Sequence, residues 1–506
     1  MKLAIGNGRR SAWQLALFSP IWQTHPFSCL KKFTIAFKNQ AIVALLAVIF
    51  LPTAHCQLPT PPDTLQFFAY DDFQDLVLSH HPVAKQAELL PELARAELLE
   101  ARGFFDPKIV SYFDRKAFKG LDYYNRFDTY LQVPTWFGVD FKAGHERNTG
   151  ARLTNPESPQ LTYAGFSVPL AQNLLIDARR ATLRQAELGR NLADADRVKL
   201  INKVLFDAAK TYWDWYFTYQ QFRLATEGFE LADVRFKAVA RRAQIGDLAP
   251  IDSIEARITR QDRLVQLQQA TVDFQNARLL VSNFLWSAAS TPLELPETAV
   301  PGPASFRTVD QESLERLLNQ ARAAHPELLA FGYKLRQLSV EERFSRNQLL
   351  PALNLNFNFL TEPKLYEDTP IPNTFLLNNH KFSVNFAMPL FLRKERGKLQ
   401  QVRVKIGQIR YDQQQATREI LNDVQASFND VKALENQLNA QELAVRDQDQ
   451  LLNAERRKFD MGESSLFLVN SRESKFLELR LKLEDLRAKY EKALAQLAYA
   501  AGGTGV

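Results

Sequence analysis

Residues 353–359 read LNLNFNF, and residues 382–388 read FSVNFAM. In both stretches apolar side chains alternate with Asn, Ser or Ala. Because successive side chains of a β-strand point to opposite faces, each stretch predicts a strand with one apolar and one polar face. A soluble β-sandwich explains the alternation equally well. The rest of the chain favours a membrane sheet, because it offers no second set of strands to cover the apolar faces, whereas lipid can cover them.

Very long helices are predicted after these strands. No proline follows Leu390, and within residues 399–459 only Gly407 interrupts good helix formers. This predicts about 90 Å of helix at 1.5 Å per residue. The apolar residues recur at steps of three and four but form a narrow stripe. Such a helix packs along one seam and leaves its other face wet, as in a coiled coil or the wall of a water-filled tube.

The chain contains a twofold internal repeat. Five identities recur at a constant offset of 244, and further on the offset settles at 216, which relates Gly246 to Gly462. A 24-residue insertion in the first copy, within Asp122 to Arg147, accounts for most of the change. The five identities are His81 and His325, Pro82 and Pro326, Glu97 and Glu341, Arg102 and Arg346, and Pro107 and Pro351.

These boundaries predict a fold that is mainly α with a β part. Gly246 and Gly462 are expected at the turns of two long antiparallel helical hairpins, because glycine suits the left-handed conformation that closes a helix. The proline-rich residues 288–306 are expected to form a linker. The first repeat then covers residues 57–287, with strands in 107–169 and a hairpin in 170–287, and the second covers 307–506, with strands in 351–389 and a hairpin in 390–500.

Residues 1–56 have the layout of a secretory signal peptide. Lysines at 31, 32 and 38 precede an apolar run from Ala41 to Leu51, which is too short to span a membrane. Cleavage is expected after Cys56, which leaves Gln57 as the new N-terminus. Lipidation of Cys56 is the alternative.

Removal of this presequence also removes six basic residues and no acidic ones, which leaves 57 of each sign. The basic balance of the whole chain therefore gives no support to nucleic-acid binding. The sequence has no His-Glu-x-x-His, phosphate-binding glycine loop or Gly-x-Ser-x-Gly motif. We therefore expect neither an enzyme nor a metal or other cofactor.

Two strands from each repeat cannot close a membrane barrel, because the smallest known barrels have about eight strands. Several copies of the chain must contribute. In its order of short helix, "HP", strands, "PL" and long hairpin with a glycine turn, given twice, the chain resembles the TolC family of outer-membrane efflux proteins across about residues 64–500.

The resemblance implies a homotrimer in the outer membrane of a Gram-negative bacterium. Four membrane strands per subunit would form a shared 12-stranded barrel in lipid, and the helices would form an α-barrel in the periplasm. It further implies a passive exit duct that docks on a periplasmic adaptor (membrane fusion) protein and an inner-membrane transporter, in a tripartite efflux pump or a type I secretion system. The alternative is a periplasmic coiled-coil scaffold or adaptor without a barrel.

The resemblance also implies acidic residues around a periplasmic aperture. Asp252, six residues after Gly246, matches that pattern, whereas Leu468 occupies the corresponding position after Gly462. The second hairpin therefore lacks the expected carboxylate at this position. The other candidates at the hairpin tips, with the two glycines, are Asp247, Asp460 and Glu463.

Overall fold

The computed structural model describes residues 66–149, 160–305, 307–362 and 378–503. The predicted presequence 1–56 and its cleavage site at Cys56 and Gln57 lie outside the described residues. Asp63–Val506 form one compact unit.

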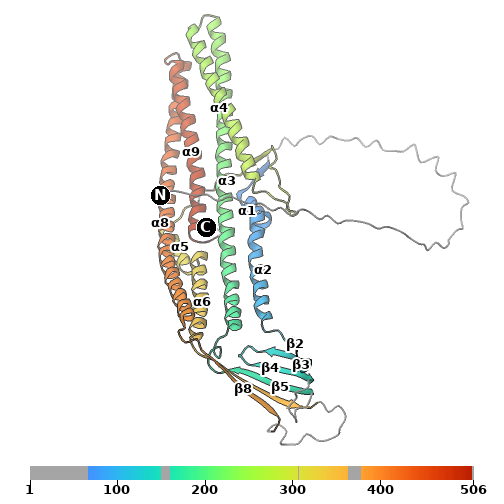
Figure 1. Cartoon of the computed structure of the whole chain (residues 1–506). Helices are drawn as coiled ribbons and strands as arrows, with labels where there is room; N and C mark the ends of the chain where they lie inside the picture. The colour runs from blue at the N-terminus through green and yellow to red at the C-terminus, as the bar shows by residue number, and fades with distance from the viewer. Residues whose placement is uncertain (1–65, 150–159, 306, 363–377, 504–506) are drawn as a thin grey trace, which may run out of the picture. The chain divides into compact units, whose positions relative to one another are not determined.

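Two antiparallel helical hairpins make up most of this unit (Figure 1). The first consists of α3 (Ala178–Gln244) and α4 (Pro250–Ser282), and the second of α8 (Arg393–Asp460) and α9 (Leu466–Ala500). With 67 and 68 residues, α3 and α8 are each about 100 Å long at 1.5 Å per residue. The prediction of long helical hairpins is confirmed. No helix in the described residues is long and apolar enough to cross a bilayer.

Shorter helices pack beside the hairpins. They are α1 (Tyr70–His80) and α2 (Pro82–Gly103) in the first half and α5 (Gln311–Ala324) and α6 (Pro326–Asn347) in the second. α2 packs on α3, and α6 packs on both α3 and α8. His81 and His325 cap α2 and α6, because Nδ1 of each ring accepts a hydrogen bond from the backbone N–H two residues later, at 3.2 and 3.3 Å. Both histidines thus have a structural role.

The apolar stripes of the helices meet in two main cores. Tyr212 and Trp215 of α3 pack with Phe73 of α1 in one core, and Phe428 of α8 packs with Tyr490 of α9 in the other. Four of these five side chains are almost fully inaccessible, and Phe428 is 5% exposed. Burial of a large apolar side chain contributes about 1.5–3 kcal/mol, so these cores fix the middle of the long helices.

The linker between the two halves contains a short strand. β6 (Ala299–Pro301) pairs in parallel with β1 (Gln66–Phe68). The Tyr212 hydroxyl donates to the Phe68 carbonyl at 2.7 Å and accepts from the Gly302 N–H at 3.0 Å. One buried tyrosine thus holds the linker against α3.

The remaining strands form one antiparallel sheet with the order β2-β3-β4-β5-β7-β8. The expected count of four strands per chain is therefore wrong for this sheet, because the first half supplies four strands and the second half two. The 24-residue insertion accounts for the difference, since Asp122 to Arg147 span most of β3 and β4. The strands are β2 (Lys108–Phe118), β3 (Leu121–Pro134), β4 (Asp140–Thr149), β5 (Gln160–Pro169), β7 (Ala352–Thr361) and β8 (His380–Ala387).

A turn separates β3 from β4, although the alternation of apolar and other residues over 137–142 indicates a strand that begins at Phe137. Phe137 and Val139 alternate with polar residues, but both lie in this turn. The Thr135 N–H donates to the Val139 carbonyl at 3.2 Å, and Gly138 has a φ of +96°. Residues with side chains rarely adopt that conformation, so glycine reverses the chain here.

Candidate functional site

Each hairpin turns through a glycine at its far end. Gly246 has a φ of +81° and Gly462 a φ of +78°, which confirms the predicted left-handed closure. In both hairpins the residue after the glycine donates its N–H to the carbonyl five residues earlier, at 2.9 Å. The two turns therefore share one hydrogen-bond pattern.

The predicted acidic residues of the first tip lie on either side of its turn. Asp247 forms an ion pair of 2.6 Å with Arg242, and both side chains are about half exposed. Asp252 lies in the first turn of α4, where the helix dipole favours a carboxylate. The first tip therefore presents one paired and one helix-stabilised carboxylate.

The predicted residues of the second tip are also at a helix turn. Asp460 is the last residue of α8, and Glu463 lies between the helices. Leu468, in the first turn of α9, is 41% exposed. Figure 1 shows the two hairpin ends as separate, so the structure does not gather the candidates of both tips into one cluster.

A buried polar cluster joins the two hairpins some way from their ends. Glu473 of α9 is 2% exposed, and its carboxylate accepts hydrogen bonds from Arg235 of α3 and from Arg456 of α8, the latter at 2.9 Å. Arg235 also donates to Asn470 at 2.8 Å, and Asn470 donates to Glu255 of α4 at 3.2 Å. All four long helices contribute. We call these five residues the hairpin clasp.

The arginines of the hairpin clasp keep Glu473 ionised. Burial by itself raises the pKa of this carboxyl, but hydrogen bonds and charge from Arg235, and then from Arg456, more than offset it. The net pKa therefore lies below its ordinary value. Loss of one partner from a buried ion pair typically costs about 3–5 kcal/mol, because the remaining charge stays buried.

Sequence reasoning missed the hairpin clasp because it compared only the positions near each glycine. Glu473 lies five residues beyond Leu468, in a stripe of α9 in which Leu466, Val469 and Leu477 are also buried. A carboxylate in an apolar stripe needs a buried partner. The position of Glu473 in this apolar stripe was therefore the sequence signal for a buried ion pair, although it does not identify Arg235 as the partner.

The six-stranded sheet has one apolar and one polar face. Register pairs align Phe166, Phe357 and Phe382 in one row across β5, β7 and β8. The neighbouring row on the same face contains Val168, Leu355 and Val384. Farther from the helices this face carries Ser111, Thr129, His145 and Thr162, and then Phe113 and Phe127. The opposite face carries Ser167, Asn354, Asn356, Asn358, Lys381, Ser383 and Asn385.

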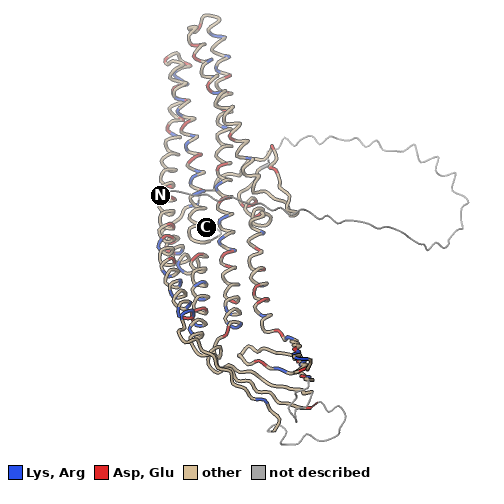
Figure 2. Tube along the Cα trace, in the orientation of Figure 1, with Lys and Arg blue, Asp and Glu red and all other residues tan. Residues whose placement is uncertain are grey.

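The apolar face is uncovered within this unit. Ile109 is 83% exposed, Phe382 57% and Phe386 67%. The helices of Figure 1 lie at one end of the strands and not over this face. Figure 2 shows that charged residues of both signs lie along the helices and at the end of β2 and β3, whereas β7 has none and β8 has only Lys381. An apolar surface of this kind marks a lipid or protein contact.

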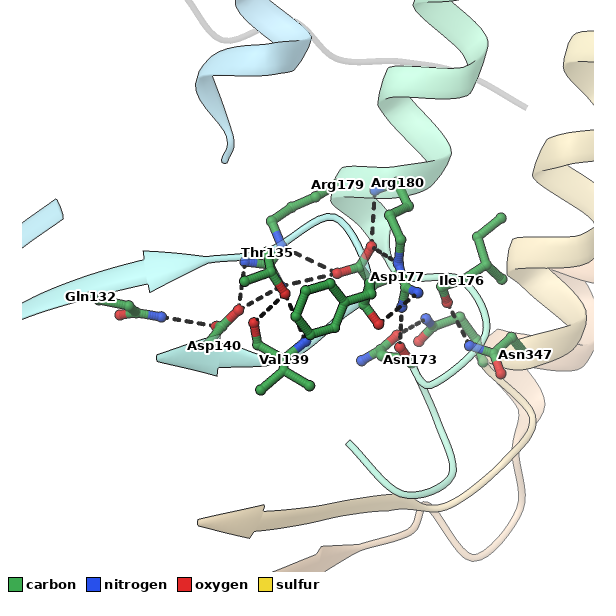
Figure 3. A network of polar contacts seen from close by, with 12 residues as sticks. Gln132, Thr135, Val139, Asp140, Asn173, Ile176, Asp177, Arg179, Arg180 and Asn347 are labelled. Carbon is green, nitrogen blue, oxygen red and sulfur yellow. Dashed lines mark hydrogen bonds and ion pairs between the residues drawn. The ribbon is translucent and has the colours of Figure 1, made fainter. Parts of the chain in front are cut away.

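A polar network ties the sheet to the helices (Figure 3). Asp177 caps α3 by accepting a hydrogen bond from the Arg180 N–H at 2.9 Å, and Arg179 bridges Asp177 to Asp140 at the start of β4. Burial raises the pKa of Asp177, but Arg180 and Arg179 bring the net pKa below its usual value. Asn347, at the end of α6, donates to the carbonyl before Asp177 at 2.6 Å. Both halves of the chain are thus joined where strands become helices.

A cavity of about 530 Å³ lies among α1, α3, α9 and the linker. Tyr70, Trp213 and Glu491 contribute to its lining. Burial raises the pKa of Glu491 to about 7, while the charge of Arg307 and a backbone hydrogen bond at Ser305 act in the opposite direction. This carboxyl therefore titrates near neutral pH.

Comparison with known families assigns the second half of this architecture. Residues 317–503 match the family described as outer membrane efflux protein. The chain carries an outer membrane efflux protein domain. This efflux protein domain contains β7, β8 and the whole second hairpin, including the Gly462 turn and Glu473. The predicted family resemblance is confirmed.

Two relatives of this chain extend the match in sequence. The cobalt-zinc-cadmium resistance protein CzcC of Cupriavidus metallidurans is 25% identical over 134 residues, which are 26% of this chain and 31% of CzcC. Protein CyaE of Bordetella pertussis is 24% identical over 308 residues, 60% of this chain and 57% of CyaE. The matched regions thus span about a third and somewhat over half of these relatives.

Solved structures similar to this chain share its fold. The Campylobacter jejuni CmeC outer membrane channel aligns with a TM-score of 0.61 at 14% identity, over 86% of each chain. The Vibrio cholerae outer membrane protein VceC aligns with a TM-score of 0.59 at 13% identity, over 86% of this chain and 96% of VceC. The open Neisseria gonorrhoeae MtrE outer membrane channel gives 0.60 at 14% identity, over 86% and 89%.

Proposed function

We propose that this chain is one subunit of a homotrimeric exit duct in the outer membrane of a Gram-negative bacterium. The observation that carries the proposal is the sheet, whose exposed apolar face and polar face lie at one end of helices about 100 Å long. Lipid covers such an apolar face, and water fills the polar side. The helices then extend the duct into the periplasm.

The hairpin ends are the proposed docking surface for a periplasmic adaptor protein. Gly246 and Gly462 form matching turns, and the exposed residues Asp247 and Glu463 follow them. An inner-membrane transporter supplies the energy in this arrangement, and the duct itself is passive. The fold and the domain match support a tripartite efflux pump or a type I secretion system equally.

The periplasmic aperture is proposed to lie between these ends and the hairpin clasp. Asp252, Asp460 and Leu468 are its candidate lining residues. The hairpin clasp holds the first hairpin to the second through a buried ion pair. Separation of the hairpins requires this pair to break, so the clasp favours the closed arrangement.

The competing function is a periplasmic coiled-coil scaffold or adaptor. The long helices alone fit it as well. The six-stranded sheet does not, because a scaffold in water would leave the apolar face of that sheet uncovered.

The deciding experiment is purification from outer membranes in detergent. A duct subunit runs as a trimer and conducts ions across a planar bilayer. A soluble monomer recovered from the periplasm, with no conductance, would contradict the proposal and favour the scaffold.

A further inference from the structure

The sheet has two open edges, formed by its outermost strands β2 and β8. Within the described residues neither β2 nor β8 has a strand on its outer side, and Figure 1 places them at opposite edges. An open edge presents a row of unpaired N–H and C=O groups, which lipid cannot satisfy. Both edges therefore need a partner strand in a membrane.

β4 has no free edge with which it could pair with a strand of another copy. It pairs with β3 through ten residue pairs and with β5 through eight. A barrel with four strands per chain would need β4 to leave β3 and to pair with β8 of a neighbouring copy. That exchange loses one complete ladder for every ladder it forms.

We propose that β2 of one subunit pairs with β8 of the next, so that each subunit contributes six strands and a trimer closes an 18-stranded barrel. The proposal rests on the duct function and adds the contact between copies. Because the sheet is antiparallel and six is even, β2 and β8 run in opposite directions. Their pairing across the interface is antiparallel, like every other pair in the sheet.

The two edges match when their ends nearest the helices are aligned. β2 begins at Lys108 and β8 ends at Ala387, so these two residues face each other. The apolar face then pairs Ile109 with Phe386 and Phe113 with Phe382. The polar face pairs Asp114 with Lys381. Cross-strand apolar and opposite-charge pairs of this kind stabilise a sheet.

The same register gives a reasonable barrel geometry. In this register Arg115 of the next copy, six residues beyond Ile109, lies level with His380. The strand register therefore shifts by six residues across the six strands of one subunit, or one residue per strand. A TIM barrel has this ratio and a strand tilt of about 36°, within the roughly 35–45° of outer-membrane barrels. The row that connects the two edges runs through Ile109, Leu131, Ala143, Ala164, Phe359 and His380.

The barrel implied here is wide. Barrels of about 16–18 strands enclose an aqueous channel in porins. The polar face, with the asparagines of β7 and Lys381, lines that channel. The duct thus has a larger membrane opening than the 12-stranded barrel expected from the family resemblance.

Cysteine pairs on the polar face test the contact between copies. Val110→Cys with Asn385→Cys lies in the proposed register. Ser111→Cys with Asn385→Cys is the matched control, because residue 111 points to the other face. Lys142→Cys with Asn385→Cys tests the alternative in which β4 meets β8. Each pair is oxidised in intact outer membranes, the products are separated without reductant, and conductance is recorded for each variant.

The expected result is a covalent trimer for the 110–385 pair, with at least about tenfold less product for the other two pairs. A conducting trimer that cross-links through 142 and 385, or through neither strand pair, would overturn the 18-stranded barrel and leave the duct function intact. Loss of conductance and of the trimer in the unsubstituted chain would instead overturn the duct function.

Discussion

Glu473 is one carboxylate held by arginines from two different hairpins. Glu473→Gln keeps its shape and removes its charge, so Arg235 and Arg456 face a neutral amide in a buried site. We expect a loss of about 3 kcal/mol in the free energy of unfolding in detergent, measured by denaturant titration. The control is Glu478→Gln on the same helix, whose exposed pair with Lys475 should contribute less than about 1 kcal/mol. Equal losses would contradict the role of the hairpin clasp.

Glu491 provides a second test at the residue scale. Its folded pKa of about 7 lies above the ordinary value of 4.5, so the folded state holds the proton more tightly. The stability that this group contributes is complete below pH 4.5 and is lost as the pH rises through 7. Glu491→Gln should remove that decline, which is on the order of 3 kcal/mol. Thermal unfolding at pH 5 and pH 8 measures it, and an unchanged difference between the two pH values would refute it.

At the scale of the element, the two hairpin turns test whether the left-handed conformation of glycine closes each hairpin. Gly246→Ala and Gly462→Ala place a side chain at a positive φ, which costs roughly 1–2 kcal/mol, although no atom lies close enough to clash. Gly407→Ala inside α8 has equal space and an ordinary helical φ, so it should stabilise by about 0.5–1 kcal/mol. Gly246→Ala and Gly462→Ala should therefore speed hydrogen exchange of the turn amides, whereas Gly407→Ala should slow hydrogen exchange in α8. A change in stability of the same sign in all three variants would exclude the left-handed conformation of the turn glycines as the cause.

The helices could be predicted from sequence because their signals are local. An apolar stripe, a long stretch without proline and a glycine at the turn are sufficient to predict α8, α9 and their connection. The strands of the second half were equally clear, since Leu353 to Phe359 alternate without interruption.

The strands of the first half were harder to predict. β2 mixes residue types on both faces, with Val110 and Asp114 on one side and Phe113 and Arg115 on the other. Pairing with β3, and not alternation, makes it a strand. The alternation around Phe137 indicates a strand where the structure has a turn, because sequence periodicity cannot show the φ of Gly138. Contacts between hairpins, such as that of Arg235 with Glu473, leave no periodic trace because they join residues 238 positions apart.

At the scale of the whole molecule, the hairpin clasp predicts how acid affects the duct. The Glu473 pKa is lowered in the folded state, so its contribution is complete above pH 4.5 and is lost as the pH falls through the folded pKa. In the proposed trimer, three subunits lose this contribution together. We expect single-channel conductance to rise in acid below about pH 4.5. Glu473→Gln should already conduct at the higher level at pH 7, whereas Glu478→Gln should follow the unsubstituted channel. A pH profile of the conductance that is unaffected by Glu473→Gln would show that the hairpin clasp does not control the aperture.

The even number of strands has a consequence for how such chains can diverge. Each strand reverses the direction of the backbone, so in the proposed barrel an insertion of one strand would place α3 on the opposite side of the membrane. An insertion of two strands restores the direction, and 24 residues are about the length of one hairpin. If the proposed barrel is correct, such ducts can gain or lose width in steps of one β-hairpin per subunit, while the ends of the helical hairpins, the proposed docking surface, keep their positions.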